Sequence, residues 1–100
     1  MVSDILHRLS GQRFITINAD ELKMLLENAD EVKETDAGLG GTIRLLRFGN
    51  DLYIQEETDK KELLLRGIES EQAADDFIRD RLETYERMWD GCGCKVHYYD

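Results

Sequence analysis

Residues 70–89 read SEQAADDFIRDRLETYERMW and form the longest amphipathic stretch of the chain. Apolar residues recur there at steps of three or four, which predicts one helix with a single wide apolar stripe. The stripe comprises Ala74, Phe77, Ile78, Leu82, Tyr85 and Trp89. Ser70 is a suitable N-terminal cap, and Gly91 is a suitable end. We therefore expect a long C-terminal helix that packs along a sheet and anchors the core.

The strands of that sheet are expected upstream of the helix. Residues 42–48 and 52–58 are rich in β-branched, leucine and aromatic side chains, and Gly49, Asn50 and Asp51 lie between them. This pattern predicts two strands joined by a tight turn. Residues 61–68 contain three consecutive leucines, which favours a strand covered on both faces.

The register of the predicted hairpin depends on the length of its loop. A three-residue loop pairs Leu46 with Ile54, and it also pairs Arg44 with Glu56. A two-residue loop at Gly49 and Asn50 gives a different apolar face, made of Ile43, Leu45, Leu52 and Ile54. Because a shift of one residue turns every side chain to the other face, the two registers predict different cores.

The N-terminal third predicts two further helices and a strand. Residues 3–10 fit a short helix, and residues 13–17 fit a strand. Asn18 followed by Glu21 has the spacing of a capping box, so a helix is expected to begin there and to end near Ala29. Residues 30–41 are charged and then glycine-rich, which favours a mobile connection, with at most a short strand near Val32.

These elements predict a single α+β domain over residues 1–100. An antiparallel sheet of about four to five strands is expected, with the long C-terminal helix and the shorter Asn18 helix packed on one face. A chain of 100 residues matches the usual size of one domain. The hydrophobic content of 41% is enough to form one core, and it is too high for an intrinsically disordered protein.

The net charge of the chain disfavours some classes of binding partner. Acidic residues number 22 against 13 basic ones, a net charge of −9. This balance disfavours nucleic acid and anionic membranes, because binding to phosphate backbones depends on many cations. Small basic patches at Arg8 and Arg13, or at Arg44 and Arg47, are the candidate exceptions. No apolar run of about 18 residues and no signal-like N-terminus is found, so a cytoplasmic protein is expected.

The candidate chemistry lies after the long helix. Cys92, Cys94 and His97 could bind zinc as thiolate and imidazole ligands, with His7 as a possible fourth ligand. The single residue between the cysteines argues against this, since structural zinc sites usually separate them by about two to four residues. Alternation in residues 94–99 also predicts a final strand, which would turn His97 away from Cys94. The simpler interpretation is two small residues in a helix-to-strand connection.

The sequence predicts a small acidic protein that is not an enzyme and that binds another protein. The acidic first half of the long helix is expected to be a solvated face, or alternatively a docking surface for a basic partner. The alternative function is a thiol-redox or metal-binding protein that uses Cys92, Cys94 and His97, with zinc as its cofactor. A pocket lined by convergent polar groups would favour a third class, a small-molecule binder or an enzyme.

Overall fold

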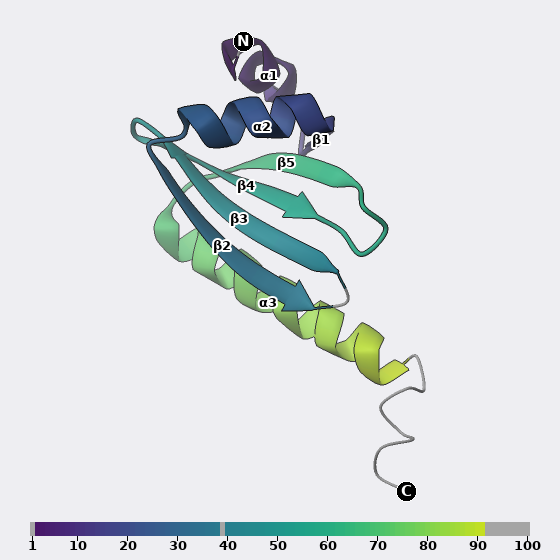
Figure 1. The fold of residues 1–100 in the computed structure, drawn as a ribbon. Helices are drawn as coiled ribbons and strands as arrows, with labels where there is room; N and C mark the ends of the chain where they lie inside the picture. The colour runs from purple at the N-terminus through teal and green to yellow at the C-terminus, as the bar shows by residue number, and fades with distance from the viewer. Residues whose placement is uncertain (1, 39, 92–100) are drawn as a thin grey trace, which may run out of the picture.

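The computed structural model describes residues 2–38 and 40–91, and it describes side chains as far as residue 87. Eight elements follow one another along this part of the chain (Figure 1). They are α1 (Val2–Leu9), β1 (Ile15–Thr16), α2 (Ala19–Asn28), β2 (Glu31–Gly38), β3 (Gly41–Phe48), β4 (Asp51–Glu57), β5 (Leu63–Ile68) and α3 (Glu71–Gly91). The α+β class is confirmed.

The strands form one antiparallel sheet of five strands in the order β1-β5-β4-β3-β2. The β3–β4 hairpin has a two-residue loop, because Phe48 pairs with Asp51. Gly49 occupies this loop with a φ of 64°, a conformation that two-residue hairpin turns require and glycine adopts at little cost. Of the two possible registers, the structure therefore has the one that pairs Leu45 with Ile54.

The sheet is buried on both faces. Neighbouring residues Leu45 and Leu46 on β3 point to opposite faces, and both are buried. On one face, Leu46 and Leu65 pack with residues of α1 and α2, including Leu25. On the other face, Ile43, Leu45 and Ile54 pack with Ala74 of α3. The fold therefore has three layers, with the sheet between two helical layers (Figure 1).

The expected placement of the long and short helices on one face was wrong. Figure 1 shows α2 and α3 on opposite sides of the sheet. The physical reason is that both Leu45 and Leu46 of a central strand must leave water, and each helix covers one of them. The periodicity of a helix shows which of its own residues it buries. It does not show which face of the sheet receives them.

Residues 30–41 were predicted to be mainly a connection, and this interpretation was also wrong. Residues 31–38 form the eight-residue strand β2 at one edge of the sheet. Most of its side chains are exposed, and Glu34 receives a 2.8 Å hydrogen bond from Nε of Arg44. An edge strand needs few apolar residues, and charged side chains on it oppose pairing with other chains. The polar composition that suggested a loop is therefore typical of an edge strand of a sheet.

Both predicted helix caps are present. The backbone N–H of Glu21 donates to Oδ1 of Asn18 over 2.8 Å, and Oε1 of Glu21 accepts from the N–H of Asn18 over 2.9 Å. At α3, the N–H of Ala73 donates to Oγ of Ser70 over 3.0 Å. The caps fix where α2 and α3 begin, so they also fix which residues of each helix face the sheet.

Candidate functional site

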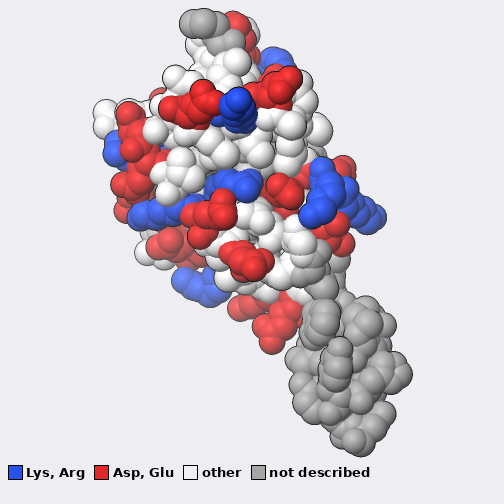
Figure 2. Space-filling model, viewed as in Figure 1, with Lys and Arg blue, Asp and Glu red and all other residues white. Residues whose placement is uncertain are grey.

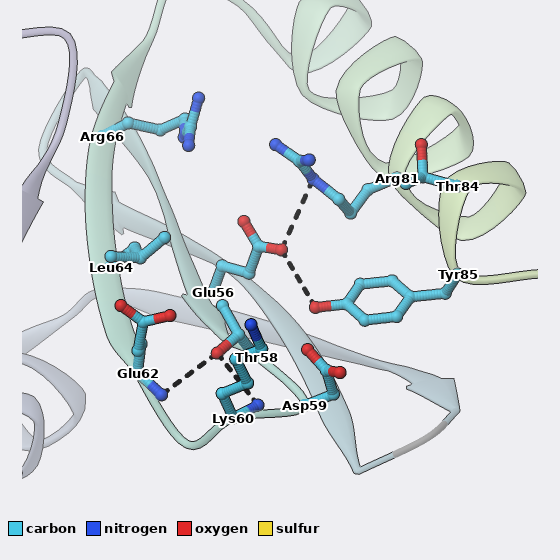
Figure 3. Close-up of a pocket in the computed structure, with 10 residues that line it drawn as sticks. All are labelled: Glu56, Thr58, Asp59, Lys60, Glu62, Leu64, Arg66, Arg81, Thr84 and Tyr85. Carbon is cyan, nitrogen blue, oxygen red and sulfur yellow. Dashed lines mark hydrogen bonds and ion pairs between the residues drawn. The ribbon is translucent and has the colours of Figure 1, made fainter. Parts of the chain in front are cut away.

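A cleft of about 290 Å³ lies between α3 and the ends of β4 and β5 (Figure 3). We call it the arginine cleft. Its lining residues are Glu56, Thr58, Asp59, Lys60, Glu62, Leu64, Arg66, Arg81, Thr84 and Tyr85. Most of these residues are polar, and they come from two strands, one loop and one helix that are distant in sequence.

Strand alternation and helical spacing together assemble the cleft. Glu56 lies two residues after Ile54 on β4 and therefore points to the same face, toward α3. Arg66 of β5 pairs with Ile54 in the register of the sheet, so it also points to that face. Arg81 and Tyr85 lie one helical turn apart on α3, which places both side chains over these strands.

Glu56 is a buried carboxylate, with 3% of its surface exposed. The Tyr85 hydroxyl donates to Oε2 of Glu56 over 3.2 Å, and Nε of Arg81 lies 3.4 Å from the same oxygen (Figure 3). Buried carboxylates are stable only when such partners replace the lost water. Gly41 makes room for this arrangement, since a Cβ at that position would lie 3.0 Å from Cζ of Tyr85.

Arg66 has no such carboxylate partner among the described residues. Its guanidinium instead lies 4.7 Å from the ring centroid of Phe77 and 5.5 Å from that of Phe14. Its Nε is buried and makes no hydrogen bond in the described structure. Cation–π contacts stabilise such a group, but they leave its Nε–H without an acceptor.

The positive charges of the cleft repel one another. Burial lowers the pKa of Arg66, and the nearby charges of Arg81 and Arg13 lower it further, while Glu56 opposes this effect. Arg81 also lies over the ring of Phe77, with 4.9 Å between its Cζ and the ring centroid. Two partly buried guanidinium groups thus share one aromatic ring, and of the two only that of Arg81 pairs with Glu56. An additional anion at this place would relieve the repulsion between them.

The basic patches considered from the sequence are largely engaged by other groups. Arg44 pairs with Glu34 and donates to Oε1 of Gln55, and Arg8 pairs with Glu21. On the face drawn in Figure 2, acidic and basic side chains are interspersed rather than gathered into a field of one sign. The acidic face predicted for the first half of the long helix comprises Glu69, Glu71, Asp75, Asp76, Asp80 and Glu83, and all six residues are exposed.

The residues proposed for metal or thiol chemistry, Cys92, Cys94 and His97, lie outside the described residues. His7 lies on α1 and is exposed. Within residues 2–38 and 40–91, no group of three or more histidine, cysteine, aspartate or glutamate side chains is placed to hold a metal ion. The same residues contain no helix long and apolar enough to cross a membrane.

The arginine cleft was not predicted from the sequence, although two signals for it were present. In the register that the structure has, Glu56 continues the buried face of Leu52 and Ile54, where an apolar residue is expected. Arg66 directly follows three leucines in a strand that the sequence predicts to be covered. A charge at a position where the pattern requires burial indicates either a partner or a site.

Comparisons with known proteins found no match to this chain. No family model, no curated protein and no solved structure matches this chain. The function must therefore be argued from the geometry of the arginine cleft.

Titration of the Tyr85 hydroxyl tests whether the Tyr85–Glu56 pair is buried. Burial raises the pKa of Tyr85, and the charge and hydrogen bond of Glu56 raise it further above the ordinary value of 10.0. Because the folded pKa is above the unfolded one, this stabilisation is fully present below the unfolded pKa and is lost as the pH rises through the folded pKa. We expect unfolding of the wild type to become easier above about pH 10.

The Tyr85→Phe variant should lose less stability over the same pH range, because it lacks this hydroxyl. Urea unfolding at several pH values on both sides of the unfolded pKa measures the difference. Tyr53 also has a pKa raised by burial and by the charge of Asp51. The Tyr53→Phe variant should therefore also lose less stability than the wild type, and it is the reference for a tyrosine whose pKa is raised without a hydrogen bond to a carboxylate. Identical pH dependence in the wild type and in Tyr85→Phe would contradict the burial of the Tyr85–Glu56 pair.

Proposed function

We propose that this protein is a non-enzymatic binding module whose arginine cleft receives an anionic group of a partner protein. The observation that carries this proposal is Arg66, a partly buried guanidinium beside two other arginines with no carboxylate partner in the described structure. Desolvating a cation without an acceptor costs free energy, and a ligand that supplies the acceptor recovers it.

The size of the cleft supports recognition of a group rather than of a whole cofactor. Sites for small molecules usually enclose about 300–1,000 Å³. At about 290 Å³, the arginine cleft is at the lower end and suits one side chain or one chain terminus. The rest of a partner would lie on the surface around it.

The arrangement of Glu56 and Tyr85 favours binding over catalysis. These are the two buried acid–base groups of the cleft, and they hydrogen-bond to each other over 3.2 Å. The hydroxyl of Thr58 is occupied in the same way, because it accepts from the backbone N–H groups of Lys60 and Glu62. A general base must be free to reach a proton of the substrate.

Anion binding can be measured by proton–nitrogen NMR of the arginine Nε–H groups. We expect acetate or sulfate, added at constant ionic strength with chloride, to shift the Arg66 and Arg81 resonances in a saturable way. Charge-assisted hydrogen bonds contribute about 1.5–3 kcal/mol. The Arg66→Gln variant should therefore bind about 10–100-fold more weakly.

The control for this measurement is Arg79→Gln. Arg79 lies on the same helix as Arg81, but its side chain is 66% exposed and pairs with Asp76 at 3.5 Å. This variant changes the net charge as Arg66→Gln does, and it should leave the affinity unchanged. Shifts that do not saturate with either anion, or an equal loss in both variants, would show that the cleft is not a binding site.

A further inference from the structure

We infer that the anionic group received by the arginine cleft is a carboxylate attached to an apolar body, and not a phosphate or sulfate group. This inference rests on the proposed function and concerns the chemistry of its ligand. The observations that support it are the charge balance inside the cleft, the way the cleft already holds one carboxylate, and the exposed ring of Phe14 beside Arg66.

The charge balance favours a ligand with one negative charge. At the centre of the cleft, the guanidinium groups of Arg66 and Arg81 face the single carboxylate of Glu56, which leaves one positive charge unbalanced. Arg13 also acts on Arg66, but it is exposed and lies outside the lining of the cleft, so water screens its charge. A carboxylate ligand neutralises this charge. A dianion would leave an uncompensated negative charge near a buried carboxylate, which a low-dielectric site strongly disfavours.

The outer part of the cleft adds one basic and two acidic side chains, so the lining as a whole has no net charge. Among all lining residues, the cations Lys60, Arg66 and Arg81 equal in number the acids Glu56, Asp59 and Glu62. Sites for phosphate groups usually concentrate cations and backbone N–H donors without such acids. The carboxylates of the cleft would repel each additional negative charge on the ligand.

The geometry shows how a second carboxylate can be held. Figure 3 shows Arg66 and Arg81 extending toward each other from β5 and α3, with Glu56 below them. Glu56 occupies the position beside Arg81, where it also accepts from Tyr85. The corresponding position beside Arg66 has donors but no acceptor in the described structure. A planar carboxylate fits the donor geometry of guanidinium groups.

The surroundings of Arg66 indicate the kind of chemical group to which the ligand's carboxylate is attached. Phe14 lies against the Arg66 guanidinium and keeps 47% of its surface exposed, which is one of two large exposed hydrophobic side chains in the described structure. An apolar body next to the ligand's carboxylate would cover this ring and remove apolar surface from water. The C-terminus of a peptide that ends in an apolar residue provides both the carboxylate and the apolar body.

The first experiment titrates wild-type protein with three small probes at constant ionic strength, again with the arginine Nε–H resonances as readout. N-acetylleucine carries the carboxylate and an apolar body, N-acetylleucinamide lacks the charge, and sulfate is the dianion. We expect N-acetylleucine to bind at least about tenfold more tightly than sulfate, a difference of about 1.4 kcal/mol. The amide should not shift the resonances.

The possible outcomes separate the ligand class from the proposed function. Tighter binding of sulfate than of N-acetylleucine would overturn the carboxylate assignment and leave anion binding intact. Saturation by neither anion would overturn both. An affinity for N-acetylleucine equal to that measured for acetate in the anion titration described above would overturn the part assigned to Phe14. A short peptide with a C-terminal leucine, compared with an amidated peptide that has an internal glutamate, distinguishes a chain terminus from an acidic side chain.

Two variants test the charge argument directly. Glu56→Gln removes the resident negative charge, so the affinity for sulfate should rise relative to that for N-acetylleucine. If this variant does not fold, as judged by circular dichroism, Arg66→Lys serves instead. It keeps the charge but loses the planar donor group, so carboxylate binding should fall about tenfold while sulfate binding changes less. An unchanged preference in a folded variant would contradict the assignment.

Discussion

Replacing Leu46 with alanine is expected to lower the free energy of unfolding by about 2–5 kcal/mol. Leu46 is fully buried at 0% exposure, and it packs with Leu25 of α2 and Leu65 of β5. The substitution removes apolar contacts and leaves a cavity between the sheet and its N-terminal helical layer. Urea unfolding monitored by circular dichroism measures the loss.

The control for this prediction is Val32→Ala on the neighbouring strand. Val32 pairs with Leu46 in the register of the sheet, but it lies at the edge and is 40% exposed. Its truncation should change stability by no more than about 0.5 kcal/mol. If Leu46→Ala costs no more than Val32→Ala, then α1 and α2 do not cover the centre of that face.

Replacing Glu56 with alanine is expected to cost about 3 kcal/mol, the lower end for breaking a buried ion pair. The carboxylate side chain is only 4% exposed, and its loss leaves Arg81 and the Tyr85 hydroxyl without their partner. The lower end applies because the Arg81 side chain is 29% exposed and keeps part of its hydration. Urea unfolding at neutral pH measures the change.

A control and a double-mutant cycle separate this network from a general charge effect. Glu83→Ala removes an exposed acid from α3 and should cost less than about 0.5 kcal/mol. Glu56→Gln and Arg81→Gln, alone and together, should show a coupling free energy of about 0.5–3 kcal/mol. Strictly additive losses would indicate that Glu56 and Arg81 do not interact in the folded protein.

The sequence was a good guide wherever short-range rules determine structure. The capping box of Asn18 and Glu21 and the cap at Ser70 depend on residues within one turn, and both are present as expected. The hairpin could be located from its turn residues, but its register could not be chosen. Loops of two and three residues both give a plausible apolar face, and only the packing of α3 on Leu45 and Ile54 selects one of them.

The arginine cleft could not be predicted because it depends on that choice of register. Glu56 points toward α3 only if β4 pairs as the two-residue loop dictates. Arg66 and Arg81 then meet it from a strand and a helix that are separate in sequence. The strand β2 was missed for a related reason. An edge strand is stabilised by backbone pairing with β3, which leaves little trace in side-chain composition.

The two-sided burial of β3 has a consequence for the order of events during synthesis. The helix α3 leaves the ribosome after every strand, so the face of Ile43, Leu45 and Ile54 has no cover of its own until then. Arg81 and Tyr85 arrive with the same helix, and without them Glu56 has neither of its partners. Assembly of the arginine cleft therefore requires α3 to dock on a sheet whose strands all precede it in the chain.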